Sequence, residues 1–285
     1  MIPRAAAHPV DLVLLDLDGT LIDDSDVLDR ETATLLRRAS KVVPLAIATG
    51  RPVADALRWA TATGAQYLIP LNGAALIRLD DRRRLWQAPG LPPRLLARLA
   101  ALRHTYRVTL HLHALDAWYV ERPDPTTEPY AQRHGLTPVV AHWRTIATPV
   151  LQAELLGAPD ALAAIRAILR PHCVPTQTRD ARGHYLDVSA PGVDKAGAAT
   201  RLLALLGQSW RGVLAIGNGE NDVPLFTRAG TSLAVAHSEP ALLDVATHRL
   251  TLPAGGRAVQ TALRAFLWRD RAALTHVLDA AEGRP

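Results

Sequence analysis

Cysteine is nearly absent from this chain of 285 residues, in which Cys173 is the only one. A single thiol cannot form an intramolecular disulfide, and its surroundings lack the paired spacing of a structural zinc site. We therefore predict a protein of a reducing compartment, located in the cytoplasm. Apolar runs long enough to cross a bilayer are also missing, and Met1 to Val10 lack the continuous apolar segment of a signal peptide. We expect no membrane partner.

Lysine is almost as rare, because Lys41 and Lys195 are the only two and arginine carries nearly all the positive charge. The net charge is +5 and the isoelectric point is about 9.9, values that by themselves are compatible with a polyanionic partner. The basic residues are spread among 27 acidic ones, however, and the densest run, Arg82 to Arg84, resembles a solvated turn. We predict no nucleic-acid partner. The 48% hydrophobic content is sufficient for a buried core.

The apolar segments alternate with helical patterns at the beginning of the chain. Strands are predicted at residues 10–17, 42–48 and 67–71, and helices at 30–39 and 53–63. Near-continuous Val and Leu in the first strand is typical of a parallel strand buried on both faces. This order predicts an α/β fold with a parallel sheet, whose strands all end along one edge.

The alternation stops after residue 80 and resumes near residue 193. Between them we expect a hairpin at 76–87, a helix at 93–104, strands at 108–113 and 117–121, and a Pro-rich turn at 123–129. A strand at 150–156, a helix at 159–169 and strands at 173–178 and 184–188 follow. The core therefore comprises residues 1–80 and 189–285, and residues 81–188 form an inserted α+β unit. A helix at 194–206, strands at 212–216 and 231–235, and helices from about 257 complete the core.

Two carboxylates stand where the first strand opens into a glycine turn. Asp16 and Asp18 are two residues apart, so in an extended chain both side chains share one face. Ligands of open parallel sheets bind at this edge. Two carboxylates would repel each other there unless a cation or a shared proton offset them. The pair is therefore a candidate Mg²⁺ site, although for an isolated Asp-x-Asp pair a turn with solvated Asp residues is the favoured reading.

Three further segments are expected at the same edge. Thr49 ends the second strand, Lys195 begins the helix after the inserted unit, and residues 217–222 follow a later strand. Together these side chains supply a nucleophile, a metal site and donors for the oxygens of a transferred phosphoryl group. With only two lysines in the chain, the position of Lys195 favours a functional role over an exposed helix start.

The ordered set resembles the haloacid dehalogenase-like hydrolases, specifically the Cof-type branch, subfamily IIB, with a C2 cap. The resemblance covers essentially the whole chain and rests on four motifs, which are residues 16–20 (DLDGT), 48–52 (ATGRP), 191–195 (PGVDK) and 217–222 (GNGEND). It implies a Rossmann-like core, an inserted α+β cap and hydrolysis of small phosphate monoesters such as sugar phosphates. It also implies Mg²⁺ as cofactor and a small phosphorylated molecule as substrate.

The resemblance also implies residue roles. Asp16 would attack phosphorus, and Asp18 would act as general acid and base, which needs a pKa raised by burial under a closed cap. The phosphate would be bound by Thr49, Gly50, Lys195, Asn221 and Asn72, and the metal by Asp16, Asp18, Asn218 and Asp222. For Asn72, an ordinary Asn-Gly turn is an equally good reading.

One position departs from the family pattern, which has aspartate where this chain has Asn218. An amide oxygen still ligates a hard cation, but the site loses one negative charge, so a weaker Mg²⁺ affinity is expected. In the inserted unit, His111 and His113 alternate along a strand and, even with His172 or Cys173, give little warrant for a metal site. Glu220 is expected to face solvent.

Two other functions stay open at this point. Transfer of the phosphoryl group to another sugar hydroxyl, as in phosphomutases, uses the same motifs. A non-catalytic binding protein would explain Asn218 and the basic charge, but it leaves the other motif residues unexplained. The oligomeric state is a monomer or a homodimer. Apolar residues of the C-terminal segment, expected to be helical, would pack on the core or on a second subunit; these are Leu267, Ala272, Leu274 and Val277.

Overall fold

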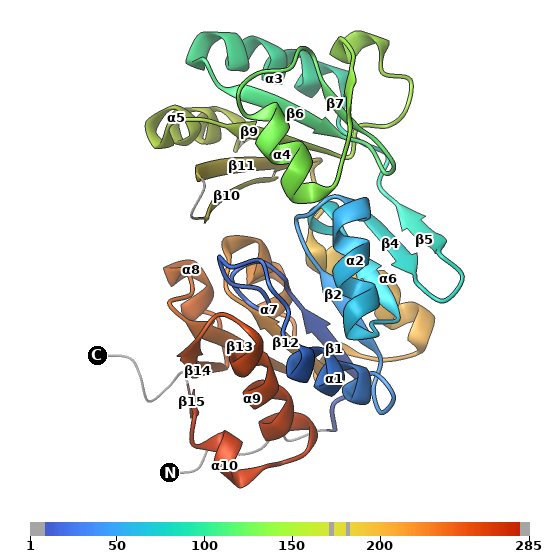
Figure 1. The fold of residues 1–285 in the computed structure, drawn as a ribbon, viewed down its shortest axis with the longest axis vertical. Helices are drawn as coiled ribbons and strands as arrows, with labels where there is room; N and C mark the ends of the chain where they lie inside the picture. The colour runs from blue at the N-terminus through green and yellow to red at the C-terminus, as the bar shows by residue number, and fades with distance from the viewer. Residues whose placement is uncertain (1–8, 171–173, 181–182, 280–285) are drawn as a thin grey trace.

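The computed structural model describes residues 9–170, 174–180 and 183–279, and two units are visible in it (Figure 1). The larger unit, called the core below, contains a nine-stranded sheet. The smaller unit, called the cap, contains a six-stranded sheet and lies over one end of the core. Among the described residues no helix is long and apolar enough to cross a membrane.

The core sheet is parallel in its centre. Its order is β15-β14-β13-β12-β1-β2-β3-β4-β5, and the pairs from β14 through β3 are parallel, while β15, β4 and β5 pair antiparallel at the two edges. The strands are β1 (Leu12–Leu15), β2 (Leu45–Ala48), β3 (Tyr67–Ile69), β4 (Ala75–Arg78), β5 (Arg83–Gln87), β12 (Val213–Gly217), β13 (Thr231–Ala236), β14 (His248–Pro253) and β15 (Val277–Asp279). The predicted α/β class is confirmed.

Helices cover both faces of the core sheet because its central strands are apolar on both sides. Alternate residues of β1 separate the two packing layers: Val13 and Leu15 belong to one cluster, and Leu12 and Leu14 to the other. The first face packs against α1 (Arg30–Ala39), α2 (Val53–Thr63), α9 (Gly256–Leu267) and α10 (Arg271–Leu274), and the second against α6 (Lys195–Leu206), α7 (Val223–Phe226) and α8 (Pro240–Leu243). Short 3₁₀ turns are η1 (Leu71–Gly73), η3 (Trp210–Gly212) and η4 (Glu220–Asp222).

One face of the cap sheet is apolar, and the other carries polar side chains together with Trp118 and Val120, which pack against Tyr130. Its order is β10-β11-β9-β6-β7-β8. The strands are β6 (Thr109–His113), β7 (Trp118–Val120), β8 (Pro138–Val140), β9 (Gln152–Leu156), β10 (Val174–Asp180) and β11 (Gly183–Ser189). Helices α3 (Pro93–Tyr106) and α5 (Pro159–Leu169) pack on the apolar face, and α4 (Thr127–His134) lies on the other face. Trp143 of the turn η2 (Trp143–Thr145) packs against the apolar cluster.

The Pro-rich turn predicted at 123–129 is wrong in its second half, because α4 begins at Thr127. Asp124 ends the preceding loop: its Oδ1 accepts the backbone N–H of Thr126 at 2.9 Å, and its own N–H donates to Thr127 Oγ1 at 2.8 Å. Pro129 falls in the first helical turn, where its missing N–H costs nothing. Pro129 is therefore accommodated in the first turn of a helix that begins at Thr127.

Two other predictions need correction. Val277 lies in strand β15, not in a helix, and together with Leu274 it is buried in the core of this chain. Residues 83–87 were placed in the inserted unit, but β5 pairs with β4 and extends the core sheet. The division of the chain otherwise stays a prediction; we propose that the cap begins after Gln87 and ends at Ser189.

Candidate active site

A buried aspartate lies directly after the central strand β1. Asp16 is only 4% exposed, and Lys195 Nζ donates to its Oδ1 at 2.7 Å. The hydroxyl of Thr20 donates to Oδ2 at 3.0 Å, and the backbone N–H of Asp16 donates to Ile216 O of β12 at 3.0 Å. Both carboxylate oxygens are thus held by donors from separate segments, so the protein itself fixes the orientation of Asp16.

Lys195 is enclosed between two carboxylates. Its Nζ lies 2.7 Å from Asp16 Oδ1 and 2.7 Å from Asp222 Oδ1, and the side chain is fully buried. Burial opposes its charge, but the two carboxylates outweigh burial and raise the pKa of Lys195. Burial, and next the charge of Asp222, raise the pKa of Asp16 to about 7 in spite of Lys195. One ammonium therefore neutralises only part of the negative charge at this place.

The loop after β12 brings Asn218 to the same place. Asp222 Oδ2 accepts the backbone N–H groups of Asn218 at 3.1 Å and Gly219 at 3.2 Å, which closes the loop. Asn218 Oδ1 lies 3.0 Å from the Thr20 hydroxyl that also contacts Asp16. Both oxygens of Asp222 accept hydrogen bonds and its side chain is buried. Asp222 therefore holds the loop and Lys195 in position.

Asp18 is bound by two arginines. Arg51 donates to it through Nε at 2.8 Å and Nη2 at 2.6 Å, and Arg133 of the cap lies 3.4 Å from Oδ1. Burial opposes ionisation, but the hydrogen bonds and charge of Arg51, and then the charge of Arg133, hold the pKa of Asp18 below its usual value. The prediction of a raised pKa is therefore wrong for this arrangement, because sequence reasoning considered burial without these partners.

Thr49 and Gly50 form the turn after β2. The Thr49 hydroxyl accepts the backbone N–H of Arg51 at 3.1 Å, and the residue is fully buried. Gly50 lines the cavity described below. In this arrangement Thr49 holds the turn that positions Gly50 and Arg51.

Asn72 links the core to the cap. Its Nδ2 donates to Asp187 Oδ2 at 2.8 Å and to Gln152 Oε1 at 3.2 Å, both on cap strands, and its Oδ1 accepts from Asn221 Nδ2 at 2.9 Å. Asn72 has φ +52°, the left-handed conformation that asparagine tolerates better than most residues. The amide thus connects the two units, and Asn221 reaches the cavity beside it.

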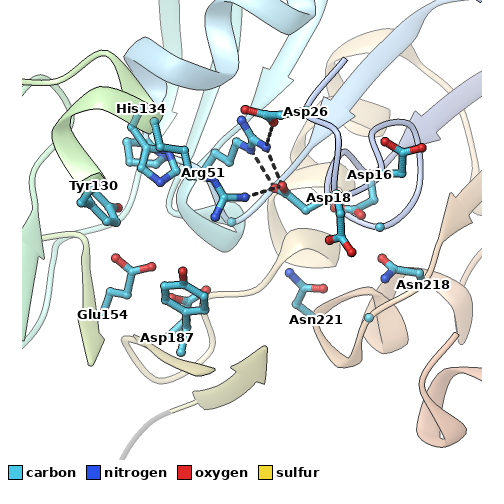
Figure 2. A pocket seen from close by; sticks show the side chains of 18 of the residues that line it. Asp16, Asp18, Asp26, Arg51, Tyr130, His134, Glu154, Asp187, Asn218 and Asn221 are labelled. Carbon is cyan, nitrogen blue, oxygen red and sulfur yellow. Dashed lines mark hydrogen bonds and ion pairs between the residues drawn. The ribbon is translucent and has the colours of Figure 1, made fainter. Parts of the chain in front are cut away.

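A cavity of about 180 Å³ separates these core residues from the cap. Figure 2 shows Asp16, Asp18, Asn218 and Asn221 on the core side, opposite Glu154 on the cap side. The lining residues are Asp16, Asp18, Gly19, Asp23, Asp24, Asp26, Gly50, Arg51, Pro52, Asn218, Gly219, Asn221 and Glu239 from the core, and Tyr130, Arg133, His134, Glu154, Tyr185 and Asp187 from the cap. Carboxylates predominate among the charged groups of this lining.

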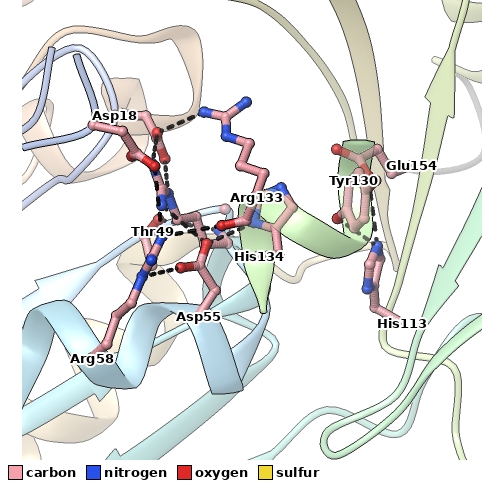
Figure 3. A network of polar contacts seen from close by, with 12 residues as sticks. Asp18, Thr49, Asp55, Arg58, His113, Tyr130, Arg133, His134 and Glu154 are labelled. Carbon is pink, nitrogen blue, oxygen red and sulfur yellow. Dashed lines mark hydrogen bonds and ion pairs between the residues drawn. The ribbon is translucent and has the colours of Figure 1, made fainter. Parts of the chain in front are cut away.

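Helix α4 is attached to the core beside the cavity (Figure 3). His134 Nδ1 lies 2.6 Å from Asp55 Oδ2, and both side chains are buried. Arg58 Nη2 donates to the carbonyl of Arg133 at 3.2 Å. At the opposite side of the cap, Arg166 of α5 forms an ion pair with Glu220, which corrects the expectation that Glu220 faces solvent. The structure therefore has the cap docked on the core.

Sequence analysis did not identify the cap residues of the cavity. Those on α4, namely Tyr130, Arg133 and His134, were missed because the predicted turn ended at residue 129 and no element was predicted directly after it. Glu154 and Asp187 could have been found, since each is a charged residue between apolar neighbours in a predicted strand, as in Gln152-Ala153-Glu154-Leu155. Asp55 gave no signal, because a first-turn acidic residue is ordinary in a helix.

The residues around Asp16 fit a hard cation in chemistry. Asp16 and Asn218 present oxygen atoms within 3.0 Å of one hydroxyl, and oxygen atoms are the ligands that hard cations prefer. Among the described residues no three His, Cys, Asp or Glu side chains group as a complete metal site. The missing third carboxylate agrees with the presence of an amide at position 218 and with the ion pair between Asp222 and Lys195. The other metal candidates of the sequence analysis, His172 and Cys173, lie outside the described residues.

The parallel α/β core, the docked cap and the enclosed aspartate define a class of capped α/β enzymes. A family model described as haloacid dehalogenase-like hydrolase matches residues 13–261. The match covers most of the chain, so the protein belongs to the haloacid dehalogenase-like hydrolase family. It is therefore a hydrolase, as the sequence motifs predicted.

Relatives and solved structures agree with this assignment. The chain is 24% identical over 258 residues to a phosphoglycolate phosphatase of Methanothermobacter thermautotrophicus, covering 90% of this chain and 98% of the relative. It is 26% identical over 272 residues to an HMP-PP phosphatase of Cronobacter sakazakii, covering 90% and 94%. The fold matches a subclass IIB sugar phosphatase with a TM-score of 0.76 at 17% identity, covering 90% of this chain and 98% of that one.

Proposed function

We propose that this protein is a Mg²⁺-dependent phosphatase that hydrolyses small phosphate monoesters through an aspartyl-phosphate on Asp16. The observation that carries the proposal is the position of Asp16, a carboxylate fixed by Lys195 and Thr20 at the end of the central strand and lining a cavity beneath the cap. The family and the relatives named phosphatases support it. The docked cap limits the substrate to a small molecule.

In the first step the Asp16 carboxylate attacks phosphorus. A bond forms between its oxygen and phosphorus, the ester P–O bond breaks, and the leaving alkoxide takes a proton from Asp18. In the second step Asp18 removes a proton from water, which attacks the aspartyl-phosphate and releases inorganic phosphate and the free Asp16 carboxylate. Each proton that Asp18 donates in the first step is recovered in the second.

Asp18 cannot donate a proton while Arg51 and Arg133 hold it ionised. A phosphate dianion in the cavity changes this balance, because it competes for both guanidinium groups and its negative charge raises the pKa of the nearby carboxyl. The arginines would thus release Asp18 when substrate is bound and restore its ionised form afterwards. In this proposal Asp18 is an acid only in the occupied site.

The remaining motif residues would bind the transferred group. Lys195 supplies positive charge next to Asp16, and Gly50 and Asn221 line the cavity where the phosphoryl oxygens would lie. Thr49 and Asn72 would act indirectly, by fixing the turn before Arg51 and the position of Asn221.

Mg²⁺ would be held by the Asp16 carboxylate, by the side-chain amide oxygen of Asn218 and by the backbone carbonyl of Asp18. Asp222 would act through Asn218 or through water. When bound, the cation would supply positive charge that lowers the pKa of Asp16 and offsets the charge of the phosphoryl group. The donors proposed here are oxygens throughout, which suits Mg²⁺ better than a soft metal.

The test is phosphate release from a panel of small phosphomonoesters, with and without Mg²⁺, by wild type and by Asp16→Asn. We expect metal-dependent release that falls about a thousandfold or more in the variant, because the nucleophile is removed while the shape is kept. Asp116→Asn, an exposed change in the cap, is the matched control and should keep full activity.

The competing functions give different results in the same assay. Transfer between sugar hydroxyls would leave the phosphate on the sugar with little free phosphate. A non-catalytic binding protein would release none, and Asp16→Asn would then make no difference to turnover. Either result would contradict the proposed hydrolysis.

A further inference from the structure

A row of polar side chains crosses the cap sheet above the cavity. The register pairs His111 of β6 with Glu154 of β9, and Glu154 with Asp187 of β11. Their neighbours along these strands, Leu110, Leu112, Ala153, Leu155, Leu186 and Val188, pack in the apolar cluster with α3 and α5. Side chains alternate along a strand, so the polar row faces the other way, and Glu154 and Asp187 line the cavity (Figure 2).

One oxygen of Glu154 is buried without a hydrogen bond, in a side chain that is 12% exposed. Its Oε2 makes no hydrogen bond with any described residue and lies 3.5 Å from His111 Nδ1 and 3.6 Å from His113 Nε2. Burial opposes ionisation, yet the two imidazoles hold the pKa of Glu154 below its usual value. Burial lowers the pKa of His113, so this ring brings no permanent positive charge. A buried negative charge with weak partners is costly unless a ligand satisfies it.

Asp187 completes the pair of carboxyl groups. Its Oδ2 accepts one hydrogen bond from Asn72 at 2.8 Å, and the residue is 6% exposed. Burial, followed by the charge of Glu154, raises the pKa of Asp187 well above its usual value. The cap side of the cavity thus offers one ionised carboxylate and one carboxyl group that ionises readily only when a positive charge or further donors are bound.

The cations that line the cavity are already committed. Arg51 contacts Asp18, Asp26 and Asp55 at 2.6 to 3.0 Å, and Arg133 also contacts Asp18. A substrate phosphate would bind these two guanidinium groups. The described residues that line the cavity include no other arginine or lysine, so none is left to bind a second anion. An anionic substituent reaching the cap would therefore meet Glu154 and Asp187 without compensation.

We propose, on the basis of the function proposed above, that Glu154 and Asp187 set the substrate class by accepting hydrogen bonds from hydroxyl or ammonium groups of the leaving alcohol. The site thus selects phosphate esters of polyols, sugars or amino sugars and rejects esters whose leaving alcohol carries a carboxylate or a second phosphate. Neutralising Glu154 lowers this selectivity, because its negative charge repels the anionic ester, and Asp187 adds to the repulsion only when it is ionised.

Two matched pairs of substrates test this class. Glucosamine 6-phosphate and glucose 6-phosphate differ in one ammonium group, and sorbitol 6-phosphate and 6-phosphogluconate differ in one carboxylate. We expect the amino sugar to equal or exceed glucose 6-phosphate in kcat/KM, and sorbitol 6-phosphate to exceed 6-phosphogluconate by about tenfold or more. Equal or better use of 6-phosphogluconate would overturn the inference.

The test must also separate failure of the inference from failure of the proposed hydrolysis. Turnover of p-nitrophenyl phosphate, which carries no hydroxyl or ammonium group, reports hydrolysis alone. Dissociation constants of the four sugar esters, measured by calorimetry with Asp16→Asn protein, give the same ranking without turnover. A catalytically silent protein would thus refute the hydrolysis while the binding order still decides on Glu154 and Asp187.

Glu154→Gln and Asp187→Asn identify the residues responsible. Glu154→Gln should narrow the ratio of kcat/KM between sorbitol 6-phosphate and 6-phosphogluconate by about tenfold, because the negative charge that repels the carboxylate is lost. Asp187→Asn should narrow this ratio less, because burial and the charge of Glu154 raise the pKa of Asp187. Glu128→Gln is the matched control, an exposed change on α4 outside the cavity lining, and should leave the ratio unchanged. An unaltered ratio in both cap variants, with their thermal unfolding intact, would show that other residues select the substrate.

Discussion

Asn218 is the residue at which this chain departs from the motif of its family, and its surroundings show what the change does. Its amide oxygen lies 3.0 Å from Thr20 Oγ1, beside the carboxylate of Asp16. An aspartate at this position would fit the same space and accept the same hydrogen bond. It would also add a negative charge to a site where one lysine already faces two carboxylates.

We therefore expect Asn218→Asp to strengthen Mg²⁺ binding by about tenfold, because affinity for a hard cation rises with the charge of its ligands. Without metal the same variant should unfold a few degrees below wild type, since the added carboxylate repels Asp16 and Asp222. Thermal unfolding in chelator and across a Mg²⁺ titration measures both effects without reference to activity.

Asn221→Asp is the control for that experiment, because it adds the same charge to the same loop at a residue that is hydrogen-bonded to Asn72, whereas Asn218 is hydrogen-bonded to Thr20. An equal gain in Mg²⁺ affinity in both variants would mean that loop charge, not ligation by residue 218, is responsible. No change in either variant would place the metal elsewhere.

At the scale of elements, the contact between η1 and α6 sets the position of Lys195. Asp194 caps α6, with its side chain accepting the Gly197 N–H at 2.7 Å, so that Lys195 is the first helical residue. Gly73 of η1 has φ +94°, and a Cβ there would lie 2.1 Å from the carbonyl oxygen of Asp194. This close approach of backbones, which only glycine permits, brings Asn72 and Lys195 to one edge of the sheet.

Gly73→Ala should therefore lower the free energy of unfolding by about 2 kcal/mol or more, through overlap and left-handed backbone strain together. Activity should fall as well, because α6 must move and Lys195 with it. Gly207→Ala is the control: Gly207 also has positive φ, at +65°, but nothing lies within 4 Å of its Cβ position. Urea unfolding of both variants measures the difference, and equal losses would show that backbone conformation alone matters.

At the scale of the whole molecule, the charged groups beneath α4 connect cap and core. Asp55 is fully buried and is bound by Arg51 at 3.0 Å, by Arg58 at 2.7 Å and by His134 of the cap at 2.6 Å. Burial opposes its ionisation, but the hydrogen bond from His134 and the charge of Arg51 hold the pKa of Asp55 below its ordinary value of 3.8. The cap contact thus depends on an ionised Asp55.

This shift predicts how stability depends on pH. A carboxyl whose folded pKa is depressed contributes stability that is complete above its unfolded pKa, near 3.8, and is lost as the pH falls through the lower folded pKa. Wild type should therefore lose stability steeply below about pH 4. Asp55→Asn should lower the free energy of unfolding at neutral pH by about 2 kcal/mol or more and should have a shallower acid limb.

Urea unfolding from pH 3 to pH 8 measures this dependence, with the exposed Asp116→Asn as control. The free energy of unfolding should fall less steeply at acid pH in Asp55→Asn, because this titrating group is removed. The same slope below pH 4 in the variant and in wild type would contradict the prediction. Small-angle scattering of the same samples reports whether the cap leaves the core as Asp55 is protonated.

The sequence by itself determined the parallel core and the motif residues at its edge. Buried parallel strands need apolar side chains on both faces, and that composition is visible without coordinates, as in β1. Helices α1 and α2 also have the predicted bounds, because their periodicity and capping are local. Asp16, Thr20, Lys195 and Asn218 meet because parallel strands end at one edge, a rule that needs topology only.

Tertiary structure alone decided the partners of those residues. The pKa of Asp18 depends on Arg51 and on Arg133, which lies 115 positions away on a helix that sequence analysis did not predict. The pairing of Glu154 with Asp187 depends on strand register in the cap, which no local pattern encodes. The chemical types of the site residues could be recognised in the sequence. Their protonation and the selectivity of the cavity depend on the docked cap, because charges interact through space.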